Sequence, residues 1–463
     1  MSPWPRRIGT IALIGVCLAS CFVVNPYVRG DGNGYFAWLA STVVDGDLDF
    51  RNQYRHADPL FSSAYLDDAG GVRPDKTTPT GHVSNQWSVG PAILWAPWFL
   101  AAHAVVRGLG IDPEDGFARW YRLFCAVGTL VYAGLTLAMG VQLAGRYGAS
   151  QRAGVVSAWV VLFGSSLFVY AYMLPFHVHA LAAFTVALFF RHWHTTSTFD
   201  TVKSWCVWGA LAGLMAMTYH VDALFGLAVV PVAIDRWRRG DRGRLVAGVA
   251  AFCGAGVCVC APQWIGKSII YGHAFTTGYQ DQFFWQSPRL WSTAFSSEHG
   301  LLLWTPLAGV GLAGCVVLAR RAERMRWLLA GAGMFYVVIA SYQNWHGLSS
   351  FGNRFFVSLT VPFIVGIAAV LQRAWDRGGA TAVALSASLA LLVLWNLGLA
   401  FQWGTKMIPS RGPVDPMRVL RQQLDVPFRI DAALRRYLGN HEQFVADIER
   451  KDVGESRGYL NRR

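Results

Sequence analysis

Asp31 is the acidic residue of this chain that lies where charge is most costly, at the end of the first long apolar run. An ionisable side chain at membrane depth is expensive, so it is a candidate for function by default. A structural role is also open, because Asp directly before a helical stretch is a favoured N-cap. The two roles are compatible, and Asp31 is the first candidate for chemistry.

Other polar side chains gather in short segments between the later apolar runs. Their types exchange protons or bind polar ligands, and they are His177, His179, Glu298, His299, Asn344 and His346. Histidines at i and i+2 do not share a helix face, so His177 and His179 predict packed, hydrogen-bonded rings rather than a metal site. Glu298 has an alternative role as a cap of the helix expected from residue 301.

Aspartates at 45, 47 and 49 alternate as they do at the start of a calcium loop. Phe50 stands where that loop requires Gly, however, and His56 stands where it requires Glu. Asp-Gly pairs are common in turns, which explains the pattern without an ion. The sequence predicts no metal site and no cofactor.

The elements that hold these residues follow from composition. Hydrophobic residues make up 54% and charged residues 14% of the chain, against about 25% charged in a soluble domain. Many apolar runs approach the length of about 20 residues that spans a bilayer core. The sequence predicts an all-α polytopic membrane protein and excludes a soluble enzyme, a secreted disulfide scaffold and a disordered chain. The net charge of +13 is concentrated in short connections, which is typical of cytoplasmic loops rather than of a nucleic-acid site.

The basic connections decide the expected topology. The apolar runs cover residues 8–28, 87–106, 120–144, 153–173, 176–190, 205–219, 223–234, 245–265, 301–318, 327–342, 355–371 and 380–401. The basic connections at 146–152, 236–244, 320–326 and 373–377 all fall in the cytoplasm only if segment 87–106 does not cross. Its Pro91 and Pro97 interrupt a helix, so we predict an interfacial or re-entrant segment. The result is about eleven transmembrane helices, with the N-terminus inside and the C-terminus outside.

Three regions are expected from this topology. Residues 1–403 form a transmembrane catalytic domain, in which residues 29–118 are a long first outer loop with juxtamembrane helices. Residues 404–463 form a polar outer tail, too small for a core of its own, which we expect to pack on the outer loops. The first run contains Leu-Ala-Ser-Cys21, similar to a lipoprotein cleavage box, but continues past it, so we expect an uncleaved anchor.

The order of these features resembles the GT-C class of integral-membrane glycosyltransferases, which includes protein O-mannosyltransferases and the lipid A aminoarabinose transferases. The resemblance is closer to a bacterial branch of that class and covers most of the membrane region. The segments that carry it are GDGNGY at 30–35, DGDLDF at 45–50, NQWSVGPA at 85–92, SSEHGLLLWTP at 296–306 and FGNRFF at 351–356.

The resemblance implies transfer of a sugar from a polyprenyl-phosphate lipid to a glycan, lipid or protein outside the cytoplasm. Asp31 is then the base that takes the proton of the acceptor hydroxyl, and inversion is expected. The leaving phosphate needs a cation, and Arg354 is the first candidate because a guanidinium grips phosphate in a fork. Lys76 is the second candidate. The alternatives are a snorkelling arginine and a solvated lysine.

The substrate cavity is expected to include Tyr35 and Asn85 beside the histidines and loop residues named above. Other branches of the class carry a second acid in the outer turn where this chain has His177 and His179. Some relatives have a lysine before the re-entrant prolines, where Asn85 and Gln86 stand here. Both departures make a role for metal doubtful.

The expected partners are the lipid-linked sugar, the acceptor and the bilayer, without nucleic acid. The expected place is the inner membrane, with the active site on the extracytoplasmic face. A flippase or transporter is the alternative function, for which charges near the bilayer midplane are expected. A non-catalytic subunit of glycan assembly is a further alternative, because a fold persists when an activity is lost.

Overall fold

The computed structural model describes residue 15 and residues 23–196, 199–279 and 282–460. The first predicted run and the anchor prediction made for it lie mostly outside these residues. Within the described part of the chain every regular element is a helix, and the strand-like pairing consists of isolated bridges. The prediction of an all-α protein is confirmed.

The first-loop region contains the short helices α2 (Asp31–Leu39), η2 (Ala40–Asp45), α3 (Arg51–Arg55), α4 (Pro59–Tyr65) and η3 (Pro74–Lys76), followed by α5 (Gly90–Leu109). The bundle is made of α6 (Arg119–Arg146), α7 (Gln151–Gly164), η4 (Val169–Met173), α8 (His179–Thr195), α9 (Val202–Thr218), η5 (His220–Ala228), α10 (Val229–Arg238), α11 (Arg242–Tyr271), α12 (Leu290–Phe295), α13 (Leu301–Trp304), α14 (Leu307–Ala319), α15 (Glu323–Ser341), η6 (Arg354–Leu359), α16 (Thr360–Arg377) and α17 (Gly379–Gly404). The tail forms α18 (Pro416–Gly439) and α19 (His441–Leu460).

Each predicted apolar run within the described residues coincides with one helix or with two in succession. Among these residues, 5 helical segments are long and apolar enough to cross a membrane: Gly90–Leu109, Arg119–Arg146, Arg242–Tyr271, Arg354–Arg377 and Gly379–Gly404. Other predicted spans are shorter or divided. The helix α7, for example, ends at Gly164, and the chain resumes helical turns at Val169. The membrane fold is therefore present, while the number of spans and their orientation stay predictions.

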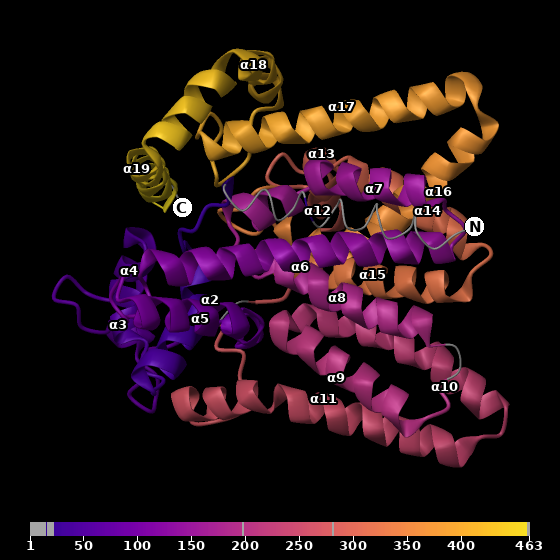
Figure 1. Cartoon of the computed structure of the whole chain (residues 1–463), viewed down its shortest axis with the longest axis horizontal. Helices are drawn as coiled ribbons and strands as arrows, with labels where there is room; N and C mark the ends of the chain where they lie inside the picture. The colour runs from indigo at the N-terminus through magenta and orange to yellow at the C-terminus, as the bar shows by residue number, and fades with distance from the viewer. Residues whose placement is uncertain (1–14, 16–22, 197–198, 280–281, 461–463) are drawn as a thin grey trace.

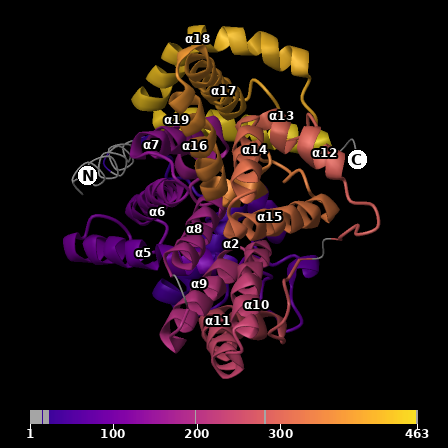
Figure 2. The same cartoon turned by 90° about the vertical axis from the view of Figure 1, so that its right-hand side faces the viewer.

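Helix α5 corrects the expectation that two prolines interrupt the segment. Pro91 lies in the first turn, where the missing N–H has no helical partner to lose, and the helix continues through Pro97. The helices of the bundle are seen largely along their length in Figure 1 and closer to end-on in Figure 2, where α5 lies across the view. This crosswise direction agrees with an interfacial segment, and its depth in a bilayer stays a prediction.

The bundle is close-packed where glycines let helix backbones approach. A Cβ added at Gly366 of α16 would lie 1.8 Å from the carbonyl oxygen of Gly311 in α14. A Cβ at Gly209 of α9 would lie 2.0 Å from the carbonyl oxygen of Phe252 in α11. Small residues at helix contacts are a typical device of membrane bundles. The first contact fixes α16, and with it the start of η6 at Arg354.

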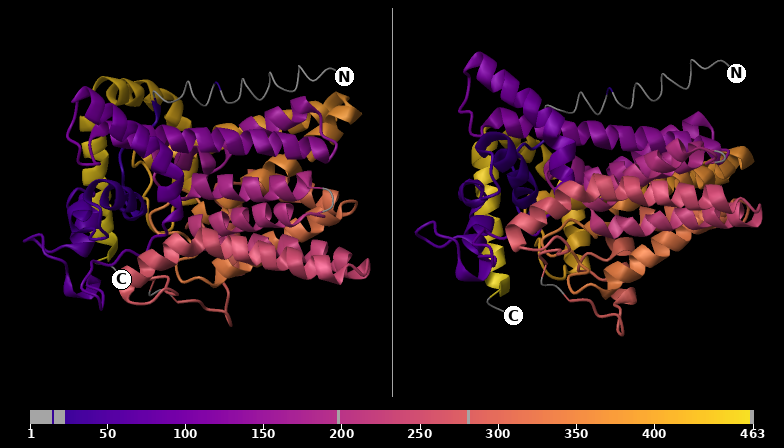
Figure 3. Two further views of the ribbon diagram at one scale, coloured as in Figure 1. Left: turned by 60° about the horizontal axis from the view of Figure 1, so that its bottom comes forward. Right: turned by 90° about the horizontal axis from the view of Figure 1, so that it is seen from below.

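The tail packs on the first-loop region, as the sequence predicts. Figure 3 shows α19 beside the early helices at the end of the bundle. The guanidinium of Arg29 lies 3.6 Å from the carboxylate of Glu449 and donates a hydrogen bond of 3.4 Å to the Val445 carbonyl oxygen. The tail therefore covers the end of the molecule that carries Asp31.

Candidate active site

Asp31 is the first residue of α2, and its position is fixed from both sides. The preceding residue, Gly30, has a φ of 50°, a conformation that glycine adopts at little cost. The Gly30 amide and the Asn33 side chain donate hydrogen bonds of 2.8 and 2.7 Å to the same carboxylate oxygen of Asp58. Asp58 in turn caps α4 by accepting from the Phe61 amide. The start of α2 is thereby tied to α4.

The Asp31 side chain does not cap its own helix. The N-cap position belongs to Gly30, and no side chain caps this end. Instead, the Asp31 carboxylate lies 2.8 Å from the Nη1 atom of Arg354, with exposed fractions of 34% for Asp31 and 12% for Arg354. The structural role left open by the sequence is thus an ion pair between the first loop and the start of η6.

Glycine at 347 makes room for the arginine. A Cβ at this position would lie 3.3 Å from both the Cγ and the Nε atoms of Arg354, and Gly347 has a φ of 77°. The Arg354 Nη1 atom also donates a hydrogen bond of 3.3 Å to His177 Nδ1. Asp31, His177 and Arg354 therefore form one polar cluster built from three segments that are distant in sequence.

Electrostatics keep the Asp31 carboxylate ionised. Burial alone would raise its pKa, but the charge of Arg354, helped by His177, outweighs burial and lowers the pKa below the usual value. Burial lowers the pKa of His177 to about 4, so this ring is neutral at neutral pH. The neutral ring accepts the hydrogen bond from Arg354. Asp31 and Arg354 are therefore the two charged groups of the cluster.

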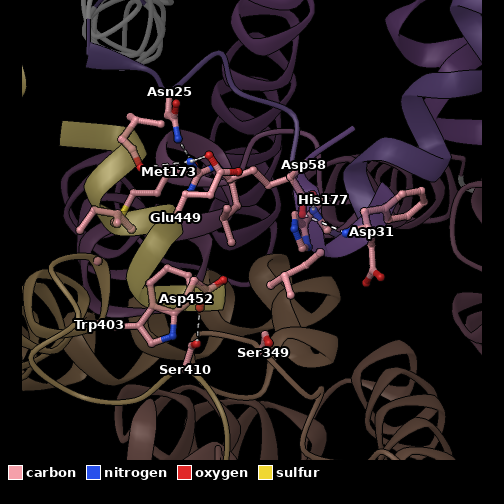
Figure 4. Close-up of a pocket in the computed structure, with 18 of the residues that line it drawn as sticks. Asn25, Asp31, Asp58, Met173, His177, Ser349, Trp403, Ser410, Glu449 and Asp452 are labelled. Carbon is pink, nitrogen blue, oxygen red and sulfur yellow. Dashed lines mark hydrogen bonds and ion pairs between the residues drawn. The ribbon is translucent and has the colours of Figure 1, made fainter. Parts of the chain in front are cut away.

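Asp31 and Arg354 line two cavities at once. The tail-side cavity, of about 620 Å³, is bounded by α19 residues Phe444, Val445 and Ile448 and by apolar side chains of α7, η4 and α17. Figure 4 shows Asp31 and His177 in this cavity, with Glu449 and Asp452 of the tail. The tyrosine-lined cavity measures about 540 Å³ and is lined by Tyr35, Tyr65, Tyr219, Tyr271, Tyr279 and Tyr342. The ion pair belongs to the walls of both cavities.

Several candidates from the sequence lie at these cavities. Tyr35, Lys76, His179 and Asn344 line the tyrosine-lined cavity, and His177 lines the tail-side cavity. Lys76 lies 3.5 Å from Asp75, whereas Arg354 is in direct contact with Asp31. Of the two cations proposed for phosphate, Arg354 is the one beside the candidate base.

The remaining candidates lie in the walls behind the cavities or in a separate cluster. Asn85 is fully buried, where it donates to the Gly34 carbonyl and accepts from the Trp87 amide. His299 Nδ1 donates a hydrogen bond of 2.8 Å to the His346 carbonyl oxygen, and His346 Nδ1 lies 3.6 Å from the Glu298 carboxylate. Glu298, His299 and His346 line neither the tail-side nor the tyrosine-lined cavity.

Two charged residues near the site were missed by the sequence analysis. Asp58 precedes a proline, a helix-start signal that predicts its cap but not its second contact with Gly30. Lys267 is buried, and its ammonium group donates to the carbonyl oxygens of Asn85 at 2.7 Å and Thr277 at 3.3 Å. A lysine following an apolar run is a signal of function that could have been noted. Its amino group lies behind the segment that contains Asn85 and Gln86.

Among the described side chains, no group of three or more His, Cys, Asp or Glu residues is placed to hold a metal ion.

Two solved structures are similar to this chain. One is an archaeal oligosaccharyltransferase, AglB from Archaeoglobus fulgidus, in complex with an inhibitory peptide and a dolichol-phosphate. It is 13% identical, with 91% of this chain and 54% of that chain covered and a TM-score of 0.48. The other is ArnT from Cupriavidus metallidurans bound to undecaprenyl phosphate. It is 14% identical, with 98% of this chain and 78% of that chain covered and a TM-score of 0.47.

The chain spans about half the length of the AglB chain (54%). No protein-family model and no curated protein matches the sequence. Both solved neighbours are GT-C glycosyltransferases, the class that the sequence motifs resemble.

Proposed function

We propose that this protein is a membrane glycosyltransferase that moves a sugar from a polyprenyl-phosphate lipid to an acceptor outside the cytoplasm, with Asp31 as the base. The observation that carries the proposal is the Asp31–Arg354 pair, with 2.8 Å between its charged atoms, in the shared wall of two cavities. A proton acceptor and a phosphate-binding cation are the two groups that such a transfer requires.

In the proposed reaction, the acceptor hydroxyl attacks the anomeric carbon as Asp31 takes its proton. The bond between that carbon and the phosphate oxygen breaks, and the polyprenyl phosphate leaves with the electron pair. A single displacement of this kind inverts the anomeric configuration. Arg354 neutralises the charge that develops on the phosphate, and its Nε atom, buried without a hydrogen-bond partner among the described atoms, is a further donor for an incoming oxygen.

The chemistry of the two walls suggests which substrate each cavity takes. The tail-side cavity combines the apolar side chains of Phe163, Phe168 and Trp403 with the Arg354 head group, a combination that suits an isoprenoid chain carrying phosphate. The tyrosine-lined cavity offers aromatic faces and hydroxyl groups, which suit a polar acceptor. The reacting carbon would then lie at the ion pair where the cavities meet.

A transporter or flippase of lipid-linked sugar is the second candidate function. Asp222 favours it, because this acid is fully buried in the bundle, where its carboxylate accepts a hydrogen bond of 3.0 Å from Ser358. Buried acids within membrane bundles often mark ion pathways. Transfer of sugar by the purified protein without a membrane gradient distinguishes the enzyme from the transporter.

The proposal is tested with purified protein and a panel of polyprenyl-phosphate sugars, with product detected by mass spectrometry and its anomeric configuration by NMR. Asp31→Asn is expected to lower kcat by about 10²–10⁴-fold, because it removes the proton acceptor and keeps the shape. Asp68→Asn is the matched control, since Asp68 is exposed in the same loop and lines neither cavity. Full transfer by the Asp31 variant would exclude this residue as the base.

A further inference from the structure

Helix α18 exposes an apolar strip that is unbroken from Met417 to Phe428 and is then interrupted by the exposed ion pair of Asp431 and Arg435. The residues of this strip are Met417, Leu420, Leu424, Phe428, Leu434 and Leu438. The first four are three or four positions apart, which places them on one face of a helix. Phe428 is 87% exposed and Leu424 is 72% exposed. An exposed apolar surface of this kind marks an interaction site.

The opposite face of α18 is held against α17. Val419 and Val426 are buried, and the Gln423 side chain donates a hydrogen bond of 2.9 Å to the carbonyl oxygen of Trp395. A Cβ at Gly398 of α17 would lie 2.1 Å from the Gln423 amide nitrogen, so this glycine permits the close approach. The docking of α18 on α17 is therefore a built contact, and the apolar strip is left on the outer side.

The contact sets the depth of α18. Trp395 lies about 13 Å along α17 from its end at Gly404, at a rise of about 1.5 Å per residue. Helix α17 is long and apolar enough to cross a membrane, and its Leu391 and Leu394 side chains are exposed. Figures 1 and 2 both show α18 at the margin of the bundle beside α17. A helix held along the flank of a spanning helix faces lipid with its outer side.

The charged residues beside the apolar strip indicate which lipid headgroups lie next to α18. Arg418, Arg421, Arg429 and Arg436 follow one another along one side of α18, with Asp425 among them. Arginines beside the apolar face of an amphipathic helix are typical of helices that lie in the plane of a membrane with anionic lipids. Arg421 and Arg429 are exposed.

We propose that α18 is an in-plane membrane helix, whose apolar strip lies in the acyl region of the leaflet where α17 ends and whose arginines contact anionic headgroups. The tail is then anchored to the bilayer at one end while α19 covers the tail-side cavity. This inference does not depend on the proposed glycosyl transfer.

The test uses the full chain in nanodiscs of phosphatidylethanolamine and phosphatidylglycerol, with a photo-reactive benzoylphenylalanine in place of Phe428. Two further variants carry the same probe in place of Leu424 or of Lys451, an exposed residue of α19. Lipid adducts are expected with the probe at positions 428 and 424 and are expected to be scarce with the probe at position 451. Cross-linked dimers at position 428 would show that a second copy covers the strip. Dimers, absence of adducts, or equal labelling at Lys451 would each overturn the proposal.

The headgroup preference is read from the same adducts. The variant with Arg421→Gln and Arg429→Gln is expected to lower the ratio of phosphatidylglycerol to phosphatidylethanolamine adducts by roughly two- to five-fold for each arginine removed. Asp431→Asn with Arg435→Gln is the matched control, because these residues form an exposed ion pair with each other and their removal leaves the net charge unchanged. An unchanged ratio in the first variant would overturn the preference for anionic lipid.

Discussion

At the scale of residues, the site depends on how Arg354 changes the acid beside it. Asp31 is partly buried, and burial by itself favours the neutral carboxylic acid. The adjacent guanidinium reverses this preference and holds the Asp31 pKa low. The carboxylate is thereby available as a proton acceptor over the whole neutral range. In the proposed reaction, a donor phosphate would add negative charge next to Asp31 and weaken the influence of Arg354, which would raise the Asp31 pKa and make the proposed base stronger.

The pH dependence of transfer should report this pair. Because the Asp31 pKa is lowered, kcat/KM of the unaltered protein is expected to stay level from neutral pH down to about pH 5. In Arg354→Gln, burial acts without the opposing charge, so the Asp31 pKa rises and the loss of activity begins at higher pH. A pH profile of kcat/KM for each protein measures the pH at which activity begins to fall.

His177 faces the same pair, and its pKa of about 4 places its titration in the acid range. His177→Gln serves as the control, since it removes that titration and keeps a hydrogen-bond acceptor. If activity falls at the same acidic pH in the unaltered protein and in Arg354→Gln, Arg354 does not lower the Asp31 pKa.

At the scale of elements, the site depends on how tightly the helices behind it pack. Arg354 begins η6, which continues into α16, and α16 is held against α14 by a glycine contact. The start of α2 is held by Asp58 of the α4 N-terminus. Neither contact includes Asp31 or Arg354 itself. Together, however, the two contacts position the segments that carry these residues and so set the distance between their charged groups.

Gly366→Val should test the role of the α14–α16 contact. The added Cβ would lie 1.8 Å from the Gly311 carbonyl oxygen, so the helices must separate. We expect the free energy of unfolding to fall by about 1–3 kcal/mol or more, as in overpacked cores. Thermal unfolding of the detergent-solubilised protein measures the loss. Gly333→Val in α15 is the control because a Cβ there meets nothing within 4 Å. Equal stability of the two variants would contradict the close contact.

At the scale of the whole molecule, the polar groups of the candidate site gather at one end of the bundle. The first-loop helices, η6 and the tail meet there, and Figure 3 shows α19 at that end. The short arginine-rich connections lie elsewhere, for instance between α10 and α11. By the positive-inside rule, this asymmetry supports the prediction that the candidate site faces away from the cytoplasm.

Reporter fusions should reveal the orientation. A reporter active only outside the cytoplasm is expected to be silent after Gly240, between α10 and α11, and active after Gly404, at the end of α17. The physical reason is the retention of basic loops on the cytoplasmic side. A cytoplasmic reporter at the same two positions is the control and should give the opposite pattern. Activity of one reporter at both positions would refute the predicted topology.

The sequence by itself determined the membrane class and the positions of most helices. These features are local, because the hydrophobicity of a run predicts a helix without knowledge of its neighbours. The sequence also marked Asp31 and Arg354 by their position at the ends of apolar runs. It was wrong that the prolines interrupt α5, since local rules did not show that Pro91 lies in the first turn and that the helix continues through Pro97.

Only the tertiary structure decided which of the marked residues meet. It brought Asp31, His177 and Arg354 together and placed Glu298 and His346 in a separate cluster. Contacts of this kind depend on the packing of helices that are distant in sequence, and packing is set by shape at many positions at once. The same packing put α18 against α17 and turned its apolar strip outward, which neither the helical pattern nor the charge of the tail specifies.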